Sequence, residues 1–447
     1  MALSGLYNLG LGALASQQAS IAATSRNIAN VNTPGYRRQS ADLAAQAGGG
    51  VQTLGFSRAD DATLSRRERT REGARAGAES LSTALDGLDA ELGPIHDELV
   101  GHVAEMFGSF GALAAAPTDP NLRTDAVDRA ESVASSLNRA ASTLSRARAD
   151  ADADIGAMAR QATDLASAVA AGNRAVRLDP SDPGLADQRD RAAQELSSMI
   201  GGTARIDPDG MMRVVLASGA SIVDGERASQ IRATPDAARG GLSRVEVVDG
   251  AHVDDVTDKL DGGQIGGRLR FRDTEASQAL AGLDRLASDL GGAINAVHSQ
   301  NAGLDGVTGR DLFTGSSAAT IVVSAAVAAD HRLLASAAAG AGPGDTSGLA
   351  ALSALRDARL GGGGTSTFQE EAIHLGAQLG AATRTARQTL SLEQGRSDTL
   401  AAIRDSLSGV SPEEELTKLS QLQHAHEATV RFISTVDDML GEMISRL

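Results

Sequence analysis

Apolar residues near both ends of the chain recur at about every seventh position, and small Ala and Ser residues lie between them near the N-terminus. So narrow an apolar stripe is typical of a helix that packs against one or a few other helices. The pattern therefore predicts seam-forming helices over residues 3–31 and from about 412 to the C-terminus. The stripe residues are Leu3, Tyr7, Leu14, Ile21 and Ile28 in the first helix, and Leu419, Leu422, His426, Val430, Ile433, Val436, Leu440, Met443 and Leu447 in the second.

The second of these helices has a well-marked start. Ser411 is a good capping residue, and Pro412 suits the first helical position, where no amide donor is needed. Glu414 lies where a capping box places its acid. Gly409 separates this helix from another helical stretch at roughly 368–407. The sequence therefore predicts a bend followed by a new helix.

The clearest heptad repeat covers residues 130–176. Small and aliphatic residues recur every seven positions, and a second such set follows four residues later with one interruption at Arg148. At 1.5 Å per residue, a continuous helix of this length spans on the order of 70 Å. Prolines at 117 and 120 precede the stretch and a Pro180–Pro183 turn follows it, so the pattern predicts a rod-like domain.

Between about 203 and 262 the pattern changes to short β-type runs. Segments such as TARI and MMRVVL alternate with Asp-Gly and Ser-Gly pairs, which are turn signals. Such closely spaced turns indicate the hairpins of a small antiparallel β domain. Helical periodicity resumes over 280–297, and a Gly- and Ala-rich stretch with short β-type pieces covers 301–366.

Together these patterns predict a mainly α fold with an inserted small antiparallel β domain, terminal coiled-coil helices and a long helical bundle. The order is nested, so the two ends of the chain can lie side by side. The predicted domains are 1–60 together with 410–447 for the terminal helices, 61–202 together with 263–409 for the long-helix bundle, and 203–262 for the β domain.

Composition narrows the classes of partner. Aromatic residues make up 2% of the chain and Trp is absent, which favours thin helical bundles built from Ala, Leu, Val and Ile. A net charge of -16 repels nucleic acid and anionic membrane surfaces. The absence of Cys excludes disulfides and thiolate metal sites. No apolar run has the length of a membrane span, and the N-terminus is a poor signal peptide, so any export route does not use an ordinary cleaved signal.

The patterns that could carry chemistry are better explained by structure. Gly361–Gly364 lack the Gly-Lys-Ser/Thr that follows in a phosphate-binding loop. His424 and His426 lie two apart on a helix, whereas paired helical metal ligands need a spacing of four. Asp305 and its neighbours lack the alternating oxygen ligands of a calcium loop and indicate a turn. The sequence therefore predicts no catalytic, cofactor-binding or metal-binding residue.

An arginine cluster stands out in the first half of the chain. Glutamates at helical spacing accompany it, so its simplest interpretation is a solvated, ion-paired helix face. The alternative is contact with an acidic partner subunit. The arginines are Arg66, Arg67, Arg69, Arg71 and Arg75, and the glutamates are Glu68 and Glu72.

The stretch NIANVNTPGYRRQ, residues 27–39, stops the first helix abruptly. Asn30 and Asn32 tolerate a left-handed turn, the residue before Pro34 is forced into an extended conformation, and Gly35 leaves the backbone free to change direction. Tyr36, one of only two Tyr in the chain, comes next. These residues join the two helical stripes as the predicted assembly residues.

Several blocks of the chain resemble one family in the same order. The residues SGLYNLGLGALASQQASIAATSRNIANVNTPGYRRQ resemble the N-terminal signature of the bacterial flagellar rod, hook and hook-associated proteins. The segments DPGLADQRDRAAQELS, VVLASGASIVDGE, GGQIGGRLRFRD and AINAVHSQNAGLDGVTGRDLF are similar to the hook-associated branch, and SGVSPEEELTKLSQLQHAHEATVRFISTVDDML is similar to its terminal helix. The resemblance covers nearly the whole chain. One departure is His426, where the family usually has Tyr.

The resemblance implies a structural protein of the flagellum, not an enzyme. Its expected role is a ring of subunits at the hook-filament junction that allows filament assembly, at an extracellular site reached by flagellar type III export. The implied partners are further copies of the chain, the hook protein, a second hook-associated junction protein and an export chaperone, with no cofactor, nucleic acid or membrane insertion. Roughly 1–60 and 410–447 are expected to be mobile in the free monomer.

Two other functions remain open from the sequence. Another axial protein of the rod or hook would share the signatures at both ends. A wall hydrolase that travels with the flagellum is a more distant alternative.

Overall fold

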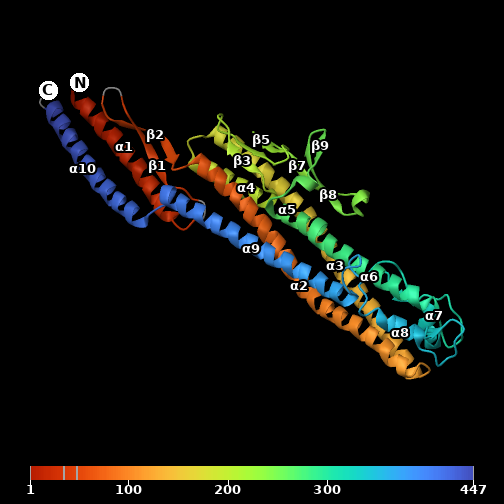
Figure 1. The fold of residues 1–447 in the computed structure, drawn as a ribbon. Helices are drawn as coiled ribbons and strands as arrows, with labels where there is room; N and C mark the ends of the chain where they lie inside the picture. Colours follow the sequence, from red (N-terminus) through yellow and green to blue (C-terminus); the bar gives the residue numbers. More distant parts are fainter. Residues whose placement is uncertain (1, 34–35, 47–48, 446–447) are drawn as a thin grey trace.

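The computed structural model describes residues 2–33, 36–46 and 49–445. The fold is elongated and mainly helical, with small antiparallel sheets, which confirms the predicted fold class. Both ends of the chain lie at one end of the molecule, and the loops around α7 and α8 form the other end (Figure 1). The chain therefore runs out along the long axis and returns.

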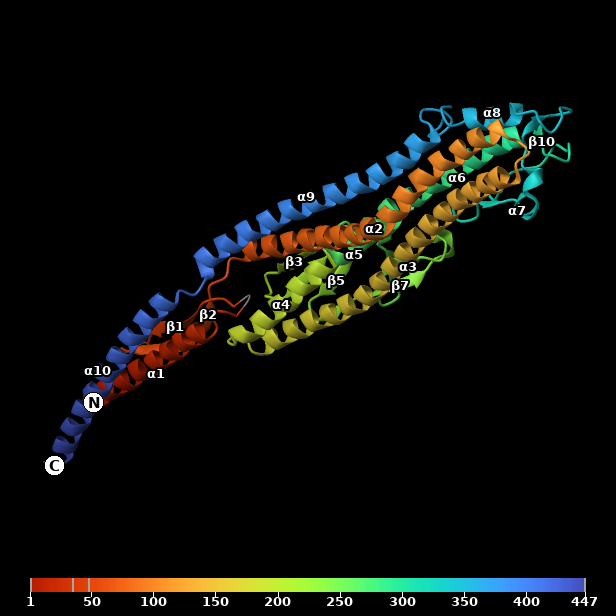
Figure 2. The ribbon, with the colours of Figure 1, turned by 90° about the horizontal axis from the view of Figure 1, so that it is seen from below.

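Two helices and a hairpin form the terminal part. Helix α1 (Ala2–Ala29) lies alongside α10 (Pro412–Ser445), and strands β1 (Gln39–Ala45) and β2 (Val51–Arg58) pair antiparallel against α1 (Figures 1 and 2). The guanidinium of Arg26 lies 4.3 Å from the ring centroid of Phe56, which fixes β2 on the helix. The hairpin differs from the purely helical terminal unit expected from the sequence.

Four long helices form the body. Three of them have a capped start: Asp61 and Asp119 cap α2 and α3 through their carboxylates, and Thr367 forms a capping box with Glu370 at α9. The heptad repeat at 130–176 lies inside one continuous helix, as expected. The four helices are α2 (Ala62–Ala115), α3 (Pro120–Leu178), α6 (Ala276–His298) and α9 (Phe368–Ser408).

The core between these helices is aliphatic with a few phenylalanines. Phe107 packs edge-on against Phe110 and parallel to Phe368, so aromatic side chains link α2 to the start of α9. The remaining interior is mainly leucine and alanine, and the alanines include the fully buried Ala126 and Ala130. Small side chains allow close helix packing in a thin bundle, as the low aromatic content suggested.

The β region at 203–262 packs on one side of α3 together with α4 (Pro183–Ile200). It consists of a four-stranded and a three-stranded antiparallel sheet, and the tight turns between strands use glycines such as Gly210 and Gly219 with positive φ. The first sheet contains β3 (Thr203–Ile206), β4 (Met212–Val215), β5 (Ser221–Asp224) and β6 (Arg227–Ala228). The second contains β7 (Gln230–Pro235), β8 (Ser243–Asp249) and β9 (His252–Asp255).

The chain returns to the helices through α5 (Gly263–Arg270) and a π-helical turn (Phe271–Glu275). The far end carries short elements in the Gly- and Ala-rich stretch, and Asp305 there pairs with Arg310 in a turn. These elements are β10 (Asn301–Ala302), β11 (Phe313–Thr314), β12 (Val322–Val323), α7 (Ala325–Ala329), β13 (Ala337–Ala338) and α8 (Ser347–Ala354).

One fully buried arginine organises these far loops. Arg123 donates to the carbonyls of Pro117 and Leu334 at 2.7 and 2.9 Å, and to the hydroxyl of Ser336 at 2.7 Å. Burial lowers the pKa of Arg123 to about 10. This one guanidinium therefore binds several backbone acceptors of loops whose strands are only two residues long.

Candidate functional site

The contact between α1 and α10 is a coiled-coil seam. Along α10 the covered side chains alternate in steps of four and three, the heptad pattern of two-helix packing. Across the seam, Gln17 Nε2 donates to Thr429 Oγ1 at 2.9 Å. The covered side chains of α10 are Glu415, Leu419, Leu422, His426, Thr429, Ile433, Val436 and Leu440.

A glycine allows the two helices to approach closely. A Cβ added at Gly10 would lie 2.7 Å from Cγ1 of Ile433, closer than real side-chain contacts. Ala23 and Val436 are the buried apolar side chains of the terminal part, at 2% and 3% exposure. The seam is therefore narrow and built largely from small residues on the α1 side.

The structure places the predicted assembly residues of the two helices, with Pro34 and Gly35, in three groups; Asn30, Asn32 and Tyr36 lie at the joint described below. Tyr7, Leu14, Ile21, Ile28, Leu419, Leu422, His426, Ile433 and Leu440 are half-buried in the terminal part. Val430 and Met443 are exposed, and Thr429 takes the seam position expected for Val430. Pro34, Gly35, Leu447 and the side chain of Leu3 lie outside the described residues.

Several large apolar side chains remain uncovered on the terminal helices. Two helices and a hairpin do not enclose them, and exposed large apolar side chains in this number favour contact with another chain. These exposed residues are Leu6, Leu9, Leu11, Leu416, Val430, Phe432, Met439, Met443 and Ile444.

The stretch after α1 forms a joint with the body. Asn27, fully buried, holds both backbone groups of Gln39: its Nδ2 donates to the carbonyl at 2.9 Å, and its Oδ1 accepts from the amide at 2.8 Å. The same Oδ1 accepts from the hydroxyl of Tyr36 at 3.0 Å. Burial, reinforced by Asp187, raises the pKa of Tyr36 to about 12, so this hydroxyl remains a donor.

The expected left-handed turn is absent from the described part of this joint. Neither Asn30 nor Asn32 has a positive φ. Instead the Nδ2 of Asn30 donates to the Arg26 carbonyl at 2.9 Å, and the Thr33 amide donates to the Asn30 carbonyl at 2.9 Å. A side chain and a tight right-handed turn therefore satisfy the last groups of α1.

The segment that enters the body after α1 and the segment that leaves it after α9 meet at this joint. The Arg38 amide donates to the Ser408 carbonyl at the end of α9, at 3.1 Å. Asn30, Asn32 and Tyr36 line a polar recess of about 540 Å³ that residues 404–414 complete. The structure thus brings these three predicted residues together with the link between α9 and α10.

The start of α10 agrees with the sequence in part. Ser411 Oγ accepts from the Glu414 amide at 3.4 Å, as a cap does. The carboxylate of Glu414 lies 4.0 Å from Arg38 Nη1 and has no described bond back to Ser411. The reciprocal half of the expected capping box is therefore replaced by a contact with the joint.

Buried charges fasten the hairpin to the body. Arg58 donates to Asp187 at 2.8 Å and to Asp190 at 2.6 Å, both on α4, and Arg37 pairs with Asp60. Burial disfavours the charge on Arg58 and Asp190, but their attraction prevails, so the pKa of Arg58 is raised and that of Asp190 lowered. Burial dominates at Asp187 and raises its pKa.

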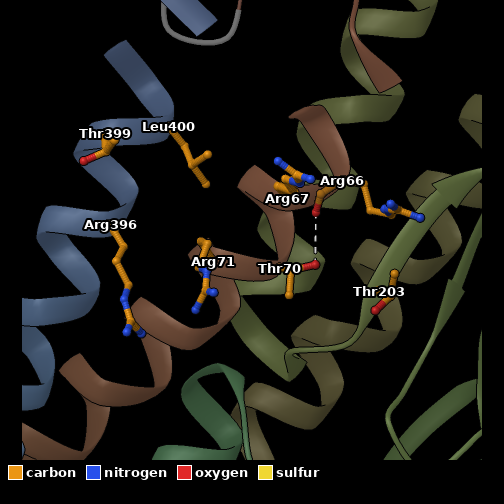
Figure 3. Close-up of a pocket in the computed structure, with 8 residues that line it drawn as sticks. All are labelled: Arg66, Arg67, Thr70, Arg71, Thr203, Arg396, Thr399 and Leu400. Atoms are coloured by element: carbon orange, nitrogen blue, oxygen red, sulfur yellow. Dashed lines mark hydrogen bonds between the residues drawn. The ribbon is translucent and has the colours of Figure 1, made fainter. Parts of the chain in front are cut away.

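Arg69 corrects the interpretation of the arginine cluster as a wholly solvated face. It is 4% exposed and donates to the Ala204 carbonyl at 3.3 Å, and burial lowers its pKa to about 10. Arg75 does form the expected ion pairs, with Glu72 at 2.7 Å and Glu79 at 2.9 Å. Arg66, Arg67 and Arg71 are exposed and line a groove between α2 and α9 (Figure 3).

The described residues do not converge on a catalytic or metal centre. No group of three His, Asp or Glu side chains among them is arranged to hold a metal ion. His298 is buried, but its Nδ1 donates to the Arg310 carbonyl at 2.7 Å and its Nε2 accepts from the Ala335 amide at 3.0 Å. Both ring nitrogens are therefore occupied by backbone. No described helix is long and apolar enough to cross a membrane.

Comparison with known proteins agrees with this architecture. The profile of the flagellar hook-associated protein FlgK helical domain matches residues 85–313. Two further profiles match the ends: that of flagella basal body rod proteins at 8–37, and that of the C-terminal part of flagellar basal body rod FlgEFG proteins at 405–447.

Individual relatives carry related names. Flagellar hook-associated protein 1 of Salmonella typhimurium is 28% identical over 331 residues, covering 70% of this chain and 60% of the relative. The protein of that name from Bacillus subtilis is 24% identical over 489 residues, covering 97% and 96%. The solved flagellar hook junction protein FlgK from Burkholderia pseudomallei has a TM-score of 0.72 at 14% identity, covering 77% of this chain and all of the other.

The fold, with its long helical bundle and paired terminal helices, defines an axial protein of the bacterial flagellum. Because the helical-domain profile covers just over half of the chain, a narrower assignment holds. The chain belongs to the FlgK family of flagellar hook-associated proteins. It spans 60% of the length of the Salmonella relative.

Proposed function

We propose that this protein is a structural subunit of the hook-filament junction, where copies form a ring that joins the hook to the filament and allows the filament to assemble. The observation that carries the proposal is the paired terminal helices, which leave several large apolar side chains uncovered. The family assignment supports the same role, since its helical-domain profile covers residues 85–313 of the body.

The packing supports assembly through the terminal part. Leu416 and Phe432 on α10 and Leu9 on α1 are about 40–55% exposed in the single chain. Burying apolar area is worth about 25 cal/mol per Å², so neighbouring copies gain stability by covering these side chains. In our proposal, residues 1–60 and 410–447 form an inner assembly domain that is mobile in the free monomer and orders fully in the ring.

The other parts of the proposal follow from this placement. The bundle of 61–202 with 263–409 surrounds the inner helices, and the β domain of 203–262 lies outermost. The partners are the hook protein, a second hook-associated junction protein and an export chaperone. The subunit acts outside the cell without a cofactor or an enzymatic activity, and it is exported without a cleaved signal.

Truncation tests the proposal. In a strain that lacks its own FlgK, a chain shortened by residues 420–447 is expected to be exported with a folded body and to leave the cell without filaments. The double substitution Ile433→Asp and Leu440→Asp, at two half-buried seam positions, is expected to weaken assembly less completely. The exposed pair Thr417→Asp and Lys418→Asp on the same helix is the control. Normal filaments from the truncated chain would refute the role of the terminal helices.

The matches at the two ends favour one other candidate, a rod or hook protein, since both end profiles are named after rod proteins. Labelled electron microscopy on isolated hook-basal bodies and hook-filament junctions separates the two. Label in the rod selects this second candidate, and label at the junction supports the first.

A further inference from the structure

An arginine-lined groove of about 690 Å³ lies outside the terminal part. Its walls come from the start of α2, the last third of α9 and the first residue of β3. In Figure 3, Arg71 from α2 and Arg396 and Leu400 from α9 face the space between the two helices, while Arg66 is directed toward Thr203 on β3. Four cations from two helices therefore line one groove.

The cations of this groove are under-neutralised. Arg71 and Arg396 both contact the single carboxylate of Glu393, at 3.5 and 2.5 Å. Arg66 and Arg67 have no ion pair within the described part of the chain. In a protein with a formal net charge of -16, this is a local positive surface on an acidic body. A positive surface of this kind attracts the carboxylate groups of a binding partner.

The groove also sets the size and shape of what it binds. Leu400 supplies an apolar patch on the α9 side, beside the guanidinium groups. Guanidinium groups present several donors and no acceptor, so they pair best with carboxylates in a fixed geometry. The fitting partner is therefore a short segment with two or more carboxylates flanking a small apolar side chain.

The chain itself carries such a segment on its opposite side. Strand β9 is an edge strand that pairs with β8 alone in the described sheet, and its Val253 is 44% exposed. Asp249 and Asp254 lie on or beside this edge. Asp254 is 3.1 Å from Nε2 of His252 on the same strand, and the nearby Asp258 already pairs with Arg239 at 2.7 Å. In Figures 1 and 2, α9 and the sheet of β7–β9 lie on opposite sides of the bundle, so the two surfaces cannot meet within one copy.

We propose that the arginine groove of one copy receives the acidic β9 edge of a neighbouring copy. A contact between two different surfaces is heterologous, and repeated contacts of this kind link copies side by side into a ring or helical array. The inference rests on the proposed function, because the contact requires several copies of the chain at one site. It adds which surfaces of those copies meet. Val253 packs against Leu400 while the aspartates pair with Arg66 and Arg67.

Charge exchange tests the contact in the full-length chain. Arg66→Glu with Arg67→Glu, or Asp249→Arg with Asp254→Arg, should each weaken self-association on the order of tenfold, measured by sedimentation velocity. An equimolar mixture of the two variants should recover it, because each groove then meets an edge of opposite charge. Arg356→Glu with Arg384→Glu, two exposed arginines outside the groove with the same charge change, is the control and should leave self-association unchanged.

Cross-linking gives a second readout that does not depend on affinity. The chain has no Cys, so Leu400→Cys and Val253→Cys on separate copies can form one defined disulfide in isolated flagella. A dimer band that requires both cysteines supports the contact. The proposed contact would be overturned if the charge variants self-associate like the wild type or if their mixture shows no recovery. It would also be overturned if the groove binds inorganic phosphate while its charge has no effect on assembly.

The two proposals fail in different ways. Junction labelling with no cross-link refutes the groove contact and leaves the proposed function intact. A protein located away from the junction refutes the proposed function, and a cross-link between copies there still supports the contact.

Discussion

Replacement of Asn27 by Ala should loosen the joint between the terminal helices and the body. Asn27 is fully buried and makes three hydrogen bonds, two of them to the backbone of Gln39, the first residue of β1. Each bond is worth about 1 kcal/mol net, so their loss costs on the order of 3 kcal/mol. Since 1.4 kcal/mol corresponds to a factor of ten, local opening should become roughly 100-fold more frequent.

Hydrogen-deuterium exchange measures this opening directly. Peptides that cover β1 and the end of α1 should exchange roughly 100-fold faster in Asn27→Ala, while those from the body should not change. Tyr36→Phe removes only one of the three bonds and should give less than a tenfold increase. Asn27→Asp keeps the acceptor but loses the donor and buries a charge. Its exchange should therefore be faster than that of Tyr36→Phe. Equal exchange in Asn27→Ala and the wild type would refute the role assigned to this side chain.

Three further predictions concern other parts of the molecule. Val436→Asp buries a charge in the seam, so it should release α10 to limited proteolysis at a cost of about 3 kcal/mol. Val430→Asp, at a position that is 48% exposed, should not. Equal cleavage of the two variants would contradict the heptad register. Arg123→Ala should lower the thermal midpoint by leaving several carbonyls unpaired, and the exposed Arg139→Ala should change it little; equal midpoints would argue against the anchor. Burial lowers the pKa of His298 below its ordinary 6.5, so the unfolded chain binds the proton more tightly. The contribution of His298 to the free energy of unfolding is then complete above about pH 6.5 and falls as the pH drops below that value, by at most about 1.4 kcal/mol per pH unit. His298→Gln should flatten this part of a plot of unfolding free energy against pH. An unchanged slope would contradict this role of His298.

The helices could be predicted from the sequence because their signals are local. The start at Pro412 and the long helix from Pro120 to Leu178 follow from capping residues and from a repeat of seven. The β region at 203–262 was equally accessible, since its turns need glycine and its strands are rich in Val and Ile.

The hairpin at 39–58 could not be predicted in this way. Its first strand, QSADLAA, is poor in β-forming residues and becomes a strand only through pairing with β2 and packing on α1. One seam position was placed one residue too late because Val430 is the more apolar choice, whereas the geometry selects Thr429. Tertiary context decided both positions.

The role of Asn27 was also missed, although the residue lies in a stretch that the sequence singled out. Asparagine at the end of a helix usually suggests a local cap. Here its partners are Tyr36 and Gln39, beyond the turn, which no helical periodicity reveals. A usable signal was its helical spacing from Ala23, which placed a polar amide on a buried stripe of small residues.

The pairing of α1 with α10 has a consequence for the order of events in the life of the chain. Gln17 and Thr429, which bond across the seam, are 412 residues apart, so α1 cannot find its partner until the whole body between them has been synthesised. An incomplete or prematurely ended chain leaves α1 single, however well its body folds. Only a chain that carries both helices can therefore form this seam, so a shortened chain lacks the paired surface whatever the state of its body.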